Sequence, residues 1–268
     1  MSAAAAGPFE LLAPAGWPTF MLVLSRTLGV AVAAPAWSSA LMPVRLRVAL
    51  GVALALALAP GIRHPAADDA TLAQPLAVGA EMLVGVAIGL TAALLMHGAT
   101  LGGEVVSVQM GLSMSSVYDP TTGATTSEMA QLTSLLVLVL YLAVGGPLIL
   151  VRGLGDSLAV IPPGSGVSLD GVGRLFLSQA ATVFVTAVRI AAPVMVALFL
   201  ANVALAILTR AVPQVSAFMV AFPLTVGLGL LVLGASLPFR GGLMARLFGQ
   251  LPEAVAAAVR SLAPVAAH

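Results

Sequence analysis

The sequence predicts an all-α, polytopic membrane-type protein built of kinked helices and helical hairpins. Of its 268 residues, 60% are hydrophobic and only 8% are charged, whereas soluble domains carry about 25% charged residues. The mean hydropathy is +1.11, which leaves more apolar surface than a soluble core can bury. We therefore expect lipid, partner subunits or both to cover much of the chain. The net charge of +1 gives no electrostatic footprint for nucleic acid, so we expect no nucleic-acid partner.

Six apolar stretches follow one another, and each is expected to be helical: 17–34, 44–59, 72–101, 129–151, 175–208 and 217–237. The second is short and the fifth is too long for a simple span of about 20 residues. Pro193 should kink or break the fifth stretch, and Gly145-Gly146-Pro147 should do the same to the fourth. The backbone groups that such breaks free must be satisfied by neighbouring protein. The pattern therefore favours a tightly packed helical assembly over isolated helices in lipid.

Glycine pairs spaced four residues apart occur twice in and just after the third stretch. They are Gly85-x-x-x-Gly89 and Gly98-x-x-x-Gly102. This spacing removes side chains from one helix face and lets two backbones approach closely. We expect both pairs to lie at helix–helix contacts.

Three charged residues lie well inside apolar stretches: Arg26, Glu81 and Arg189. A charge in lipid costs about 3 kcal/mol or more, so these are expected to be buried charges that face protein, partner subunits or water. Pairs between helices and a conduction path both remain open as explanations.

Residues 106–115 alternate apolar residues with small or polar ones, which is the period of an extended strand. The apolar side of this segment contains Val106, Val108, Met110, Leu112 and Met114. Asp119-Pro120 is turn chemistry, and Thr125 with Glu128 matches a capping box that would start the next helix. We expect a loop of about twenty residues between two helices, and loops of that length are often functional.

The C-terminal part of the chain changes character at residue 240. Leucine and valine recur there at helical spacing, and Pro252 is a candidate break. This pattern predicts an amphipathic helix for an interface. The chain is thus expected to form one helical domain over 1–239 and an amphipathic tail over 240–268.

One enzymatic interpretation rests on Tyr118-Asp119 and Gly153-Leu154-Gly155-Asp156, which match two short motifs of intramembrane aspartyl proteases. Against it, Asp119 precedes a proline in a loop, and the proline-alanine-leucine signature of those proteases is missing. The three histidines are scattered without metal-ligand spacing. We expect no enzymatic activity, no metal and no cofactor. A small-molecule permease is a further alternative, which would require regular spans and a substrate site within the membrane.

Three motifs in order along the chain resemble those of the flagellar biosynthetic protein FliR family, subunits of the flagellar type III export gate. The first is the run 109–120, with the candidate residues Gln109, Met110, Gly111, Leu112, Met114, Tyr118, Asp119 and Pro120. The second is the pattern of Arg210, Pro213, Gln214, Phe222 and Pro223. The third is Arg26 with Pro35 and Pro43-Val44-Arg45. Ser216, Ala221 and Thr225 depart locally from the family pattern.

The resemblance implies a structural subunit that joins two other small membrane-protein types, and a further membrane component, in a closed helical export-gate assembly. Such an assembly lies in the bacterial inner membrane at the flagellar basal body and passes unfolded flagellar proteins. The plug segment, about 106–128, would project into the lumen, where Met110, Leu112 and Met114 would form a dry constriction. The equivalent subunit of a virulence injectisome is the alternative that the sequence leaves open.

Overall fold

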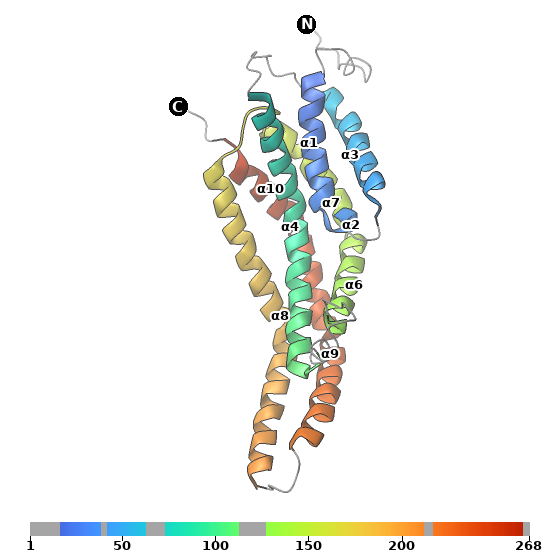
Figure 1. Cartoon of the computed structure of the whole chain (residues 1–268), viewed down its shortest axis with the longest axis vertical. Helices are drawn as coiled ribbons and strands as arrows, with labels where there is room; N and C mark the ends of the chain where they lie inside the picture. The colour runs from blue at the N-terminus through green and yellow to red at the C-terminus, as the bar shows by residue number, and fades with distance from the viewer. Residues whose placement is uncertain (1–16, 39–41, 63–72, 113–126, 212–216, 265–268) are drawn as a thin grey trace. The chain divides into compact units, whose positions relative to one another are not determined.

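The structure is a computed structural model that describes residues 17–38, 42–62, 73–112, 127–211 and 217–264 (Figure 1). No β-strand occurs among these residues, and nearly all of them are helical. The all-α class is confirmed. The chain divides into two compact units, in which unit 1 comprises 1–93, 145–179 and 249–268, and unit 2 comprises 94–144 and 180–248.

Unit 1 begins with a pair of packed helices. Helix α1 packs against α3 (Figure 1), and the two are connected through the short α2. Their bounds are Trp17–Ala33 for α1, Pro35–Ser38 for α2, Val44–Leu58 for α3 and Ala59–Gly61 for the 3-10 turn η2. The core around this pair contains Phe20 and Val23 of α1, Ala55 of α3, Ala59 of η2 and Leu158 of α7 (Gly146–Val160). Small alanines on α3 let it lie close to α1.

Unit 1 also contains the first part of α4 (Ala73–Met110), α7 (Gly146–Val160), the start of α8 (Leu169–Ala211) and α10 (Leu251–Leu262). Helix α10 is amphipathic and packs against α7, with Leu251, Val255, Ala258, Val259 and Leu262 buried. Gln250 separates the end of α9 from the start of α10. Pro252 lies in the first turn of α10, where a backbone N–H has no acceptor within the helix, so proline removes no hydrogen bond there. Residue 240, at which the sequence predicts the start of an amphipathic tail, lies inside α9 (Ala217–Gly249).

The glycine pair at 85 and 89 lies where α4 meets α1. A methyl group added at Gly89 would lie 2.8 Å from Cβ of Ala33, and one added at Gly85 would overlap the backbone carbonyl of Arg26. These distances are shorter than a van der Waals contact, so only glycine allows this approach. The predicted role of the first pair is confirmed.

In unit 2, the second part of α4 packs against α8 through the second glycine pair. Methyl groups at Gly98 and Gly102 would each lie 2.9 Å from a backbone oxygen of α8, those of Val183 and Ala187 respectively. The next residue, Gly103, lies equally close to the backbone of α6 (Glu128–Ala143). Within unit 2, α4 therefore contacts α8 through Gly98 and Gly102, and α6 through Gly103.

The core of unit 2 joins α4, α8 and α9. It contains Val106, Met110, Ala191, Val194, Leu198 and Leu233. The later part of α8 and the first part of α9 form a long antiparallel pair (Figure 1).

The sequence predicts a kink or a break at Pro193. Helix α8 continues through it, so the break is wrong, and the kink stays a prediction. Proline leaves the carbonyl of Arg189 without its helical donor and weakens the turn around it. The adjacent carbonyl, that of Ile190, accepts a hydrogen bond of 3.1 Å from Nε of Arg240 on α9. The neighbouring helix thus places a buried donor at the proline turn, one residue from the carbonyl that the proline leaves free.

The predicted interruption at Gly145 is confirmed. Helix α6 ends at Ala143 and α7 begins at Gly146. Gly145 itself has φ of +77°, in the left-handed region that glycine adopts without strain. Pro147 follows in the first turn of α7, where proline is well tolerated.

Three of the described helical segments are long and apolar enough to cross a membrane: Pro75–Met110, Leu169–Ala211 and Ala221–Gly249. The bent pair α6 and α7 would make a fourth. The polytopic membrane class is confirmed, although the candidate spans are fewer than the six apolar stretches in the sequence.

Replacing Gly85 by valine is expected to destabilise the protein, because the side chain would overlap the backbone of α1. We expect a loss of at least about 1–3 kcal/mol, the usual cost of overpacking. Gly79→Val on the same helix is the matched control, since no atom lies within 4 Å of a methyl group there. Thermal unfolding of the detergent-solubilised protein measures both variants. Equal stability of the two would contradict the close crossing of α1 and α4.

Candidate plug segment and buried polar network

The first part of the plug segment is helical, because α4 runs to Met110. The prediction of an extended strand is therefore wrong for 106–110. Val106 and Met110 are one helical turn apart and both are buried, whereas Val108 is 57% exposed. The alternation of apolar and small residues is typical of a strand. The spacing of four residues between Val106 and Met110 instead places both on one face of the helix.

Gly111 ends α4 in a Schellman motif. Its φ is +80°, its N–H donates to the carbonyl of Val108 at 3.1 Å, and the N–H of Leu112 donates to the carbonyl of Ser107 at 3.1 Å. These two bonds satisfy carbonyls that the end of a helix leaves free. A glycine one residue after an apolar helical run is a known stop signal, and it could have been read from the sequence.

Met110 lies in the core of unit 2 and is fully buried. Helix α9 makes room for it at Gly229, where an added methyl group would lie 2.7 Å from Cγ of Met110. Leu112 packs at the edge of the same core, and Gln109 is exposed. Met110 thus anchors the segment and does not belong to a projecting apolar face.

The structure brings the two most specific sequence motifs together at Gly111. A methyl group there would lie 3.8 Å from the ring of Phe222 on α9. Phe222 is about half exposed, and Pro223, the next residue of α9, is also exposed. Arg210 is exposed in the last turn of α8. No signal of this contact lies in the sequence, because Gly111 and Phe222 are far apart in the chain.

Several candidate residues lie outside the described residues: Met114, Tyr118, Asp119, Pro120, Pro213 and Gln214. Their expected roles stay predictions.

Helix α6 begins after Ser127, and Thr125 also lies outside the described residues. The hydroxyl of Ser127 accepts from the N–H of Ala130 at 3.3 Å and donates to Oε2 of Glu104 on α4 at 2.6 Å. The N-cap is thus Ser127, and the capping box predicted from Thr125 and Glu128 is not the one that starts this helix. Glu104 ties the start of α6 to α4.

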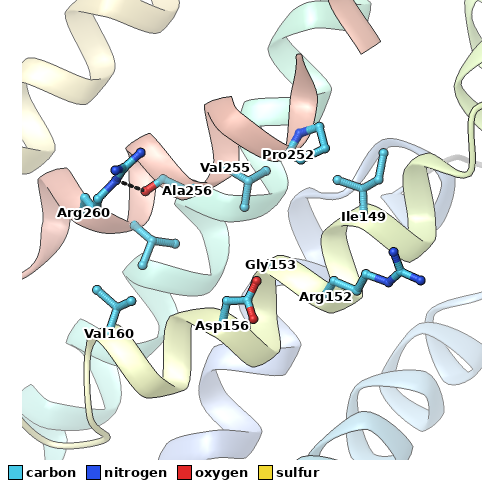
Figure 2. Close-up of a pocket in the computed structure, with 10 residues that line it drawn as sticks. Ile149, Arg152, Gly153, Asp156, Val160, Pro252, Val255, Ala256 and Arg260 are labelled. Carbon is cyan, nitrogen blue, oxygen red and sulfur yellow. Dashed lines mark hydrogen bonds between the residues drawn. The ribbon is translucent and has the colours of Figure 1, made fainter. Parts of the chain in front are cut away.

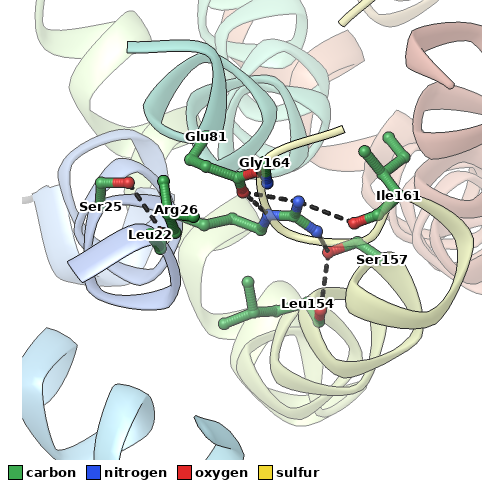
Figure 3. A network of polar contacts seen from close by, with 8 residues as sticks. All are labelled: Leu22, Ser25, Arg26, Glu81, Leu154, Ser157, Ile161 and Gly164. Carbon is green, nitrogen blue, oxygen red and sulfur yellow. Dashed lines mark hydrogen bonds and ion pairs between the residues drawn. The ribbon is translucent and has the colours of Figure 1, made fainter. Parts of the chain in front are cut away.

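A buried ion pair links α1 to α4 in unit 1 (Figure 3). Arg26 is 0% exposed and Glu81 is 2% exposed. Nε of Arg26 donates to Oε2 of Glu81 at 2.6 Å, and Nη2 lies 2.6 Å from the same oxygen. Such a pair is stable in a low dielectric only if the remaining donors and acceptors are also satisfied.

The rest of this network reaches α7 and the turn that follows it. Arg26 donates to Oγ of Ser157 at 3.2 Å and to the carbonyl of Ile161 at 2.9 Å. The other carboxylate oxygen of Glu81 accepts from the N–H of Gly164 at 2.9 Å. Figure 3 shows the guanidinium group at the centre of these contacts. One arginine therefore fixes three separate segments of unit 1.

Arg189 differs from the other two charges. It is exposed on α8, so the prediction that it is buried is wrong within this chain. Its neighbours Thr186, Ala187 and Ile190 face the packed side of the helix, which turns Arg189 outward. Arg26 and Glu81 form the inter-helix pair that was one of the two open explanations.

The residues of the protease interpretation are described only in part. Asp156 is exposed on α7, and Asp119 lies outside the described residues. Among the residues that the structure describes, no group of three or more histidine, aspartate or glutamate side chains could hold a metal ion.

The sequence profile described as "Bacterial export proteins, family 1" matches residues 17–251. The chain is 31% identical to the flagellar biosynthetic protein FliR of Escherichia coli (strain K12) over 239 residues, which cover 88% of each chain. The chain belongs to the FliR family. It is also 27% identical to the FliR protein of Pectobacterium carotovorum subsp. carotovorum, over 86% of this chain and 88% of that one. Against FliR of Bacillus subtilis (strain 168) the identity is 28%, over 81% of this chain and 85% of the relative.

The FliR family match begins at the first residue of α1 and reaches the first residue of α10. It thus includes every element of the polar network around Arg26 and the end of α4. The described features of both sites lie in the part of the chain that the family profile matches.

Replacing Arg26 by leucine is expected to lower the free energy of unfolding by about 3–5 kcal/mol, because Glu81 is left buried without a partner. The double variant Arg26→Leu/Glu81→Leu should lose less than the two single variants together, since no unpaired charge remains. Thermal unfolding of the protein co-purified with its membrane partners measures all three. Arg45→Leu, at an exposed position of α3, is the control and should change stability by about 0.5 kcal/mol at most. Additive losses from the single variants would show that the two side chains do not act as a pair.

Proposed function

We propose that the chain is a channel-forming structural subunit of the flagellar type III export gate, through which unfolded flagellar proteins cross the bacterial inner membrane. Membership of the FliR family supports a role in the flagellar export apparatus, since the relatives reported above carry the name of a flagellar biosynthetic protein. The named relatives are flagellar, so the flagellar branch is favoured over a virulence injectisome.

The observation that carries the proposal is the apolar surface of α8 and α9. Large hydrophobic side chains are exposed along both helices, among them Phe176, Phe184, Phe199, Leu200, Ile207, Leu230, Leu231 and Phe239. Helix α8 has 43 residues, which at about 1.5 Å per residue makes a helix about 65 Å long. A hydrocarbon core of about 30 Å covers less than half of that length. The remaining apolar surface needs protein partners.

A gate subunit explains this surface better than a small-molecule permease does. A permease needs spans of similar length and a polar site between them, whereas the candidate spans here contain 36, 43 and 29 residues. Two other small membrane-protein types and a further membrane component of the export apparatus are the proposed partners. Their apolar surfaces would cover α8 and α9, and lipid would cover the rest.

The plug segment is the proposed moving part. Up to Met110 it is fixed in the core of unit 2, and Gly111 then turns the chain away from the helix axis. We place the apolar seal at Leu112 and at Met114, because apolar constrictions block ions by losing their water. Methionine is flexible and can pack again around a passing chain.

Deleting 113–126 is expected to leave the assembly intact but make the membrane leaky, because the deletion removes Met114 from the seal and spares the core. Permeability of cells to a small solute, motility and co-purification of the partner proteins are measured together. Met110→Ala is the matched comparison, and it should reduce assembly by destabilising unit 2 by about 2–5 kcal/mol. Unchanged permeability in a deletion variant that still assembles would rule out a sealing role. Loss of assembly on deletion would indicate that the segment is a packed lid.

A further inference from the structure

The charged side chains of α8 and α9 nearly all have the same sign. Residues 171–252, which include all of α9 and all but the first two residues of α8, contain no aspartate or glutamate. No ion pair joins an arginine of this region to another residue that the structure describes. The region contains the arginines Arg174, Arg189, Arg210, Arg240 and Arg246. Their positive charge therefore has no counter-charge within the two helices beyond residue 170.

The pocket between α7 and α10 in unit 1 shows a different pattern (Figure 2). Its charged residues are of both signs, since Asp156 lies between Arg152 and Arg260, whose guanidinium groups point away from each other. Interspersed charges of both signs are typical of a solvated surface. The one-sided charge of α8 and α9, on helices that are otherwise apolar, needs another explanation.

Arg189 lies near the middle of α8 within an exposed apolar face. Arg189 is itself exposed, and Val185, Val188 and Val196 around it are 48%, 60% and 59% exposed. Val185 is one turn before Arg189 and Val196 two turns after it, so the helix places them on the same side. Any helix that covers these valines also removes Arg189 from water.

A second guanidinium group reaches the same turn of α8 from α9. Arg240 is only 8% exposed, and its Nε donates to the carbonyl of Ile190, the residue after Arg189, at 3.1 Å. Its Nη2 is buried and has no hydrogen-bond partner among the residues that the structure describes. An arginine without a counter-charge in apolar surroundings is costly. The missing negative charge must therefore come from outside the chain.

A lipid phosphate and a protein carboxylate are the two candidate counter-charges. Large apolar side chains are exposed on α8 both before and after Arg189. A lipid headgroup at the level of Arg189 would leave one of these two halves in water, whereas a partner helix along α8 covers both and can bring a carboxylate to this level. The exposed side chains are Phe176, Leu177 and Phe184 before Arg189, and Phe199, Leu200 and Ile207 after it.

We propose that α8 binds an apolar helix of another membrane subunit of the export gate, and that this helix carries an aspartate or glutamate that pairs with Arg189. The inference rests on the proposed function, because it takes the partner to be a gate subunit. A guanidinium group can hold both oxygens of a carboxylate, and the charge of Arg240 adds to the attraction. The ion pair fixes the register of the partner along a face that is otherwise apolar.

The chain contains no lysine, which permits a direct test. Arg189→Lys keeps the positive charge and introduces the only lysine of the chain. The variant is co-purified with its membrane partners and treated with a carbodiimide, which joins an amine to a carboxylate in contact with it. Mass spectrometry then identifies the cross-linked peptides. We expect a cross-link from position 189 to an aspartate or glutamate in an apolar segment of a partner protein.

Two controls accompany this experiment. The wild-type chain has no side-chain amine and should give no cross-link from α8. Arg152→Lys introduces the lysine one turn before Asp156 on α7, and it should cross-link within this chain and not to a partner. This variant shows that the reagent joins a new lysine to a neighbouring carboxylate.

Charge reversal tests the same contact in cells. Arg189→Glu should reduce the recovery of the partner proteins at least about tenfold and abolish motility, because two carboxylates would meet away from water. Replacing the cross-linked carboxylate of the partner by arginine should restore both. Arg189→Leu should also reduce recovery, since it leaves the carboxylate without a counter-charge.

Three results would overturn the inference. The first is an assembled Arg189→Lys complex with no cross-link from position 189, and the second is a cross-link that reaches only this chain. The third is wild-type recovery and motility with both Arg189→Leu and Arg189→Glu, which would leave water or lipid phosphate as the counterpart of Arg189. Failure of the wild-type chain to co-purify with any other gate subunit would instead overturn the proposed function.

Discussion

The buried pair of Arg26 and Glu81 is the constraint on which unit 1 depends. An arginine with no access to water must satisfy its donors within the protein, and here α4, α7 and the turn after α7 provide the acceptors. Glu81 and Gly85 lie one turn apart on the same helix, so one face of α4 supplies both the partner of the Arg26 side chain and the space for its backbone. The ion pair and the close packing therefore both act at the crossing of α1 and α4.

In unit 2 the constraint is packing, with glycines in place of charges. Gly98, Gly102 and Gly103 let α4 approach α8 and α6, and Gly229 on α9 makes room for Met110. These contacts hold the C-terminal end of α4 in place directly before the proposed plug. A seal that must open needs a fixed base, and the buried Met110 with the left-handed Gly111 provides one. Opening would then bend the chain beyond Gly111 and leave the helices in place.

The sequence predicted the starts of most helices to within a few residues, because prolines and caps such as Pro43 mark where apolar runs begin. It placed several ends too early, since α4 runs to Met110 and α9 to Gly249, beyond the apolar runs 72–101 and 217–237. It also predicted the glycine contacts and the burial of Arg26 and Glu81, and it left open whether such charges pair between helices. The errors share a physical cause, which is that they depend on tertiary contacts. The donor from Arg240 that supports α8 at Pro193 is distant in sequence, and the outward direction of Arg189 depends on which face of α8 packs. The meeting of Gly111 with Phe222 likewise follows from the fold alone.

The central claim is that partner subunits cover the apolar faces of α8 and α9. Because the sequence contains no cysteine, a single cysteine at the exposed Phe199 or Leu231 can be labelled without background from the rest of this chain. The rate of reaction with a water-soluble maleimide is compared between the chain alone and the assembled complex in the same detergent. Cysteine at the exposed Arg174 is a candidate reference position. Labelling at 199 and 231 should slow at least about tenfold on assembly, as for a contact that excludes water, and equal rates in the two samples would contradict the account.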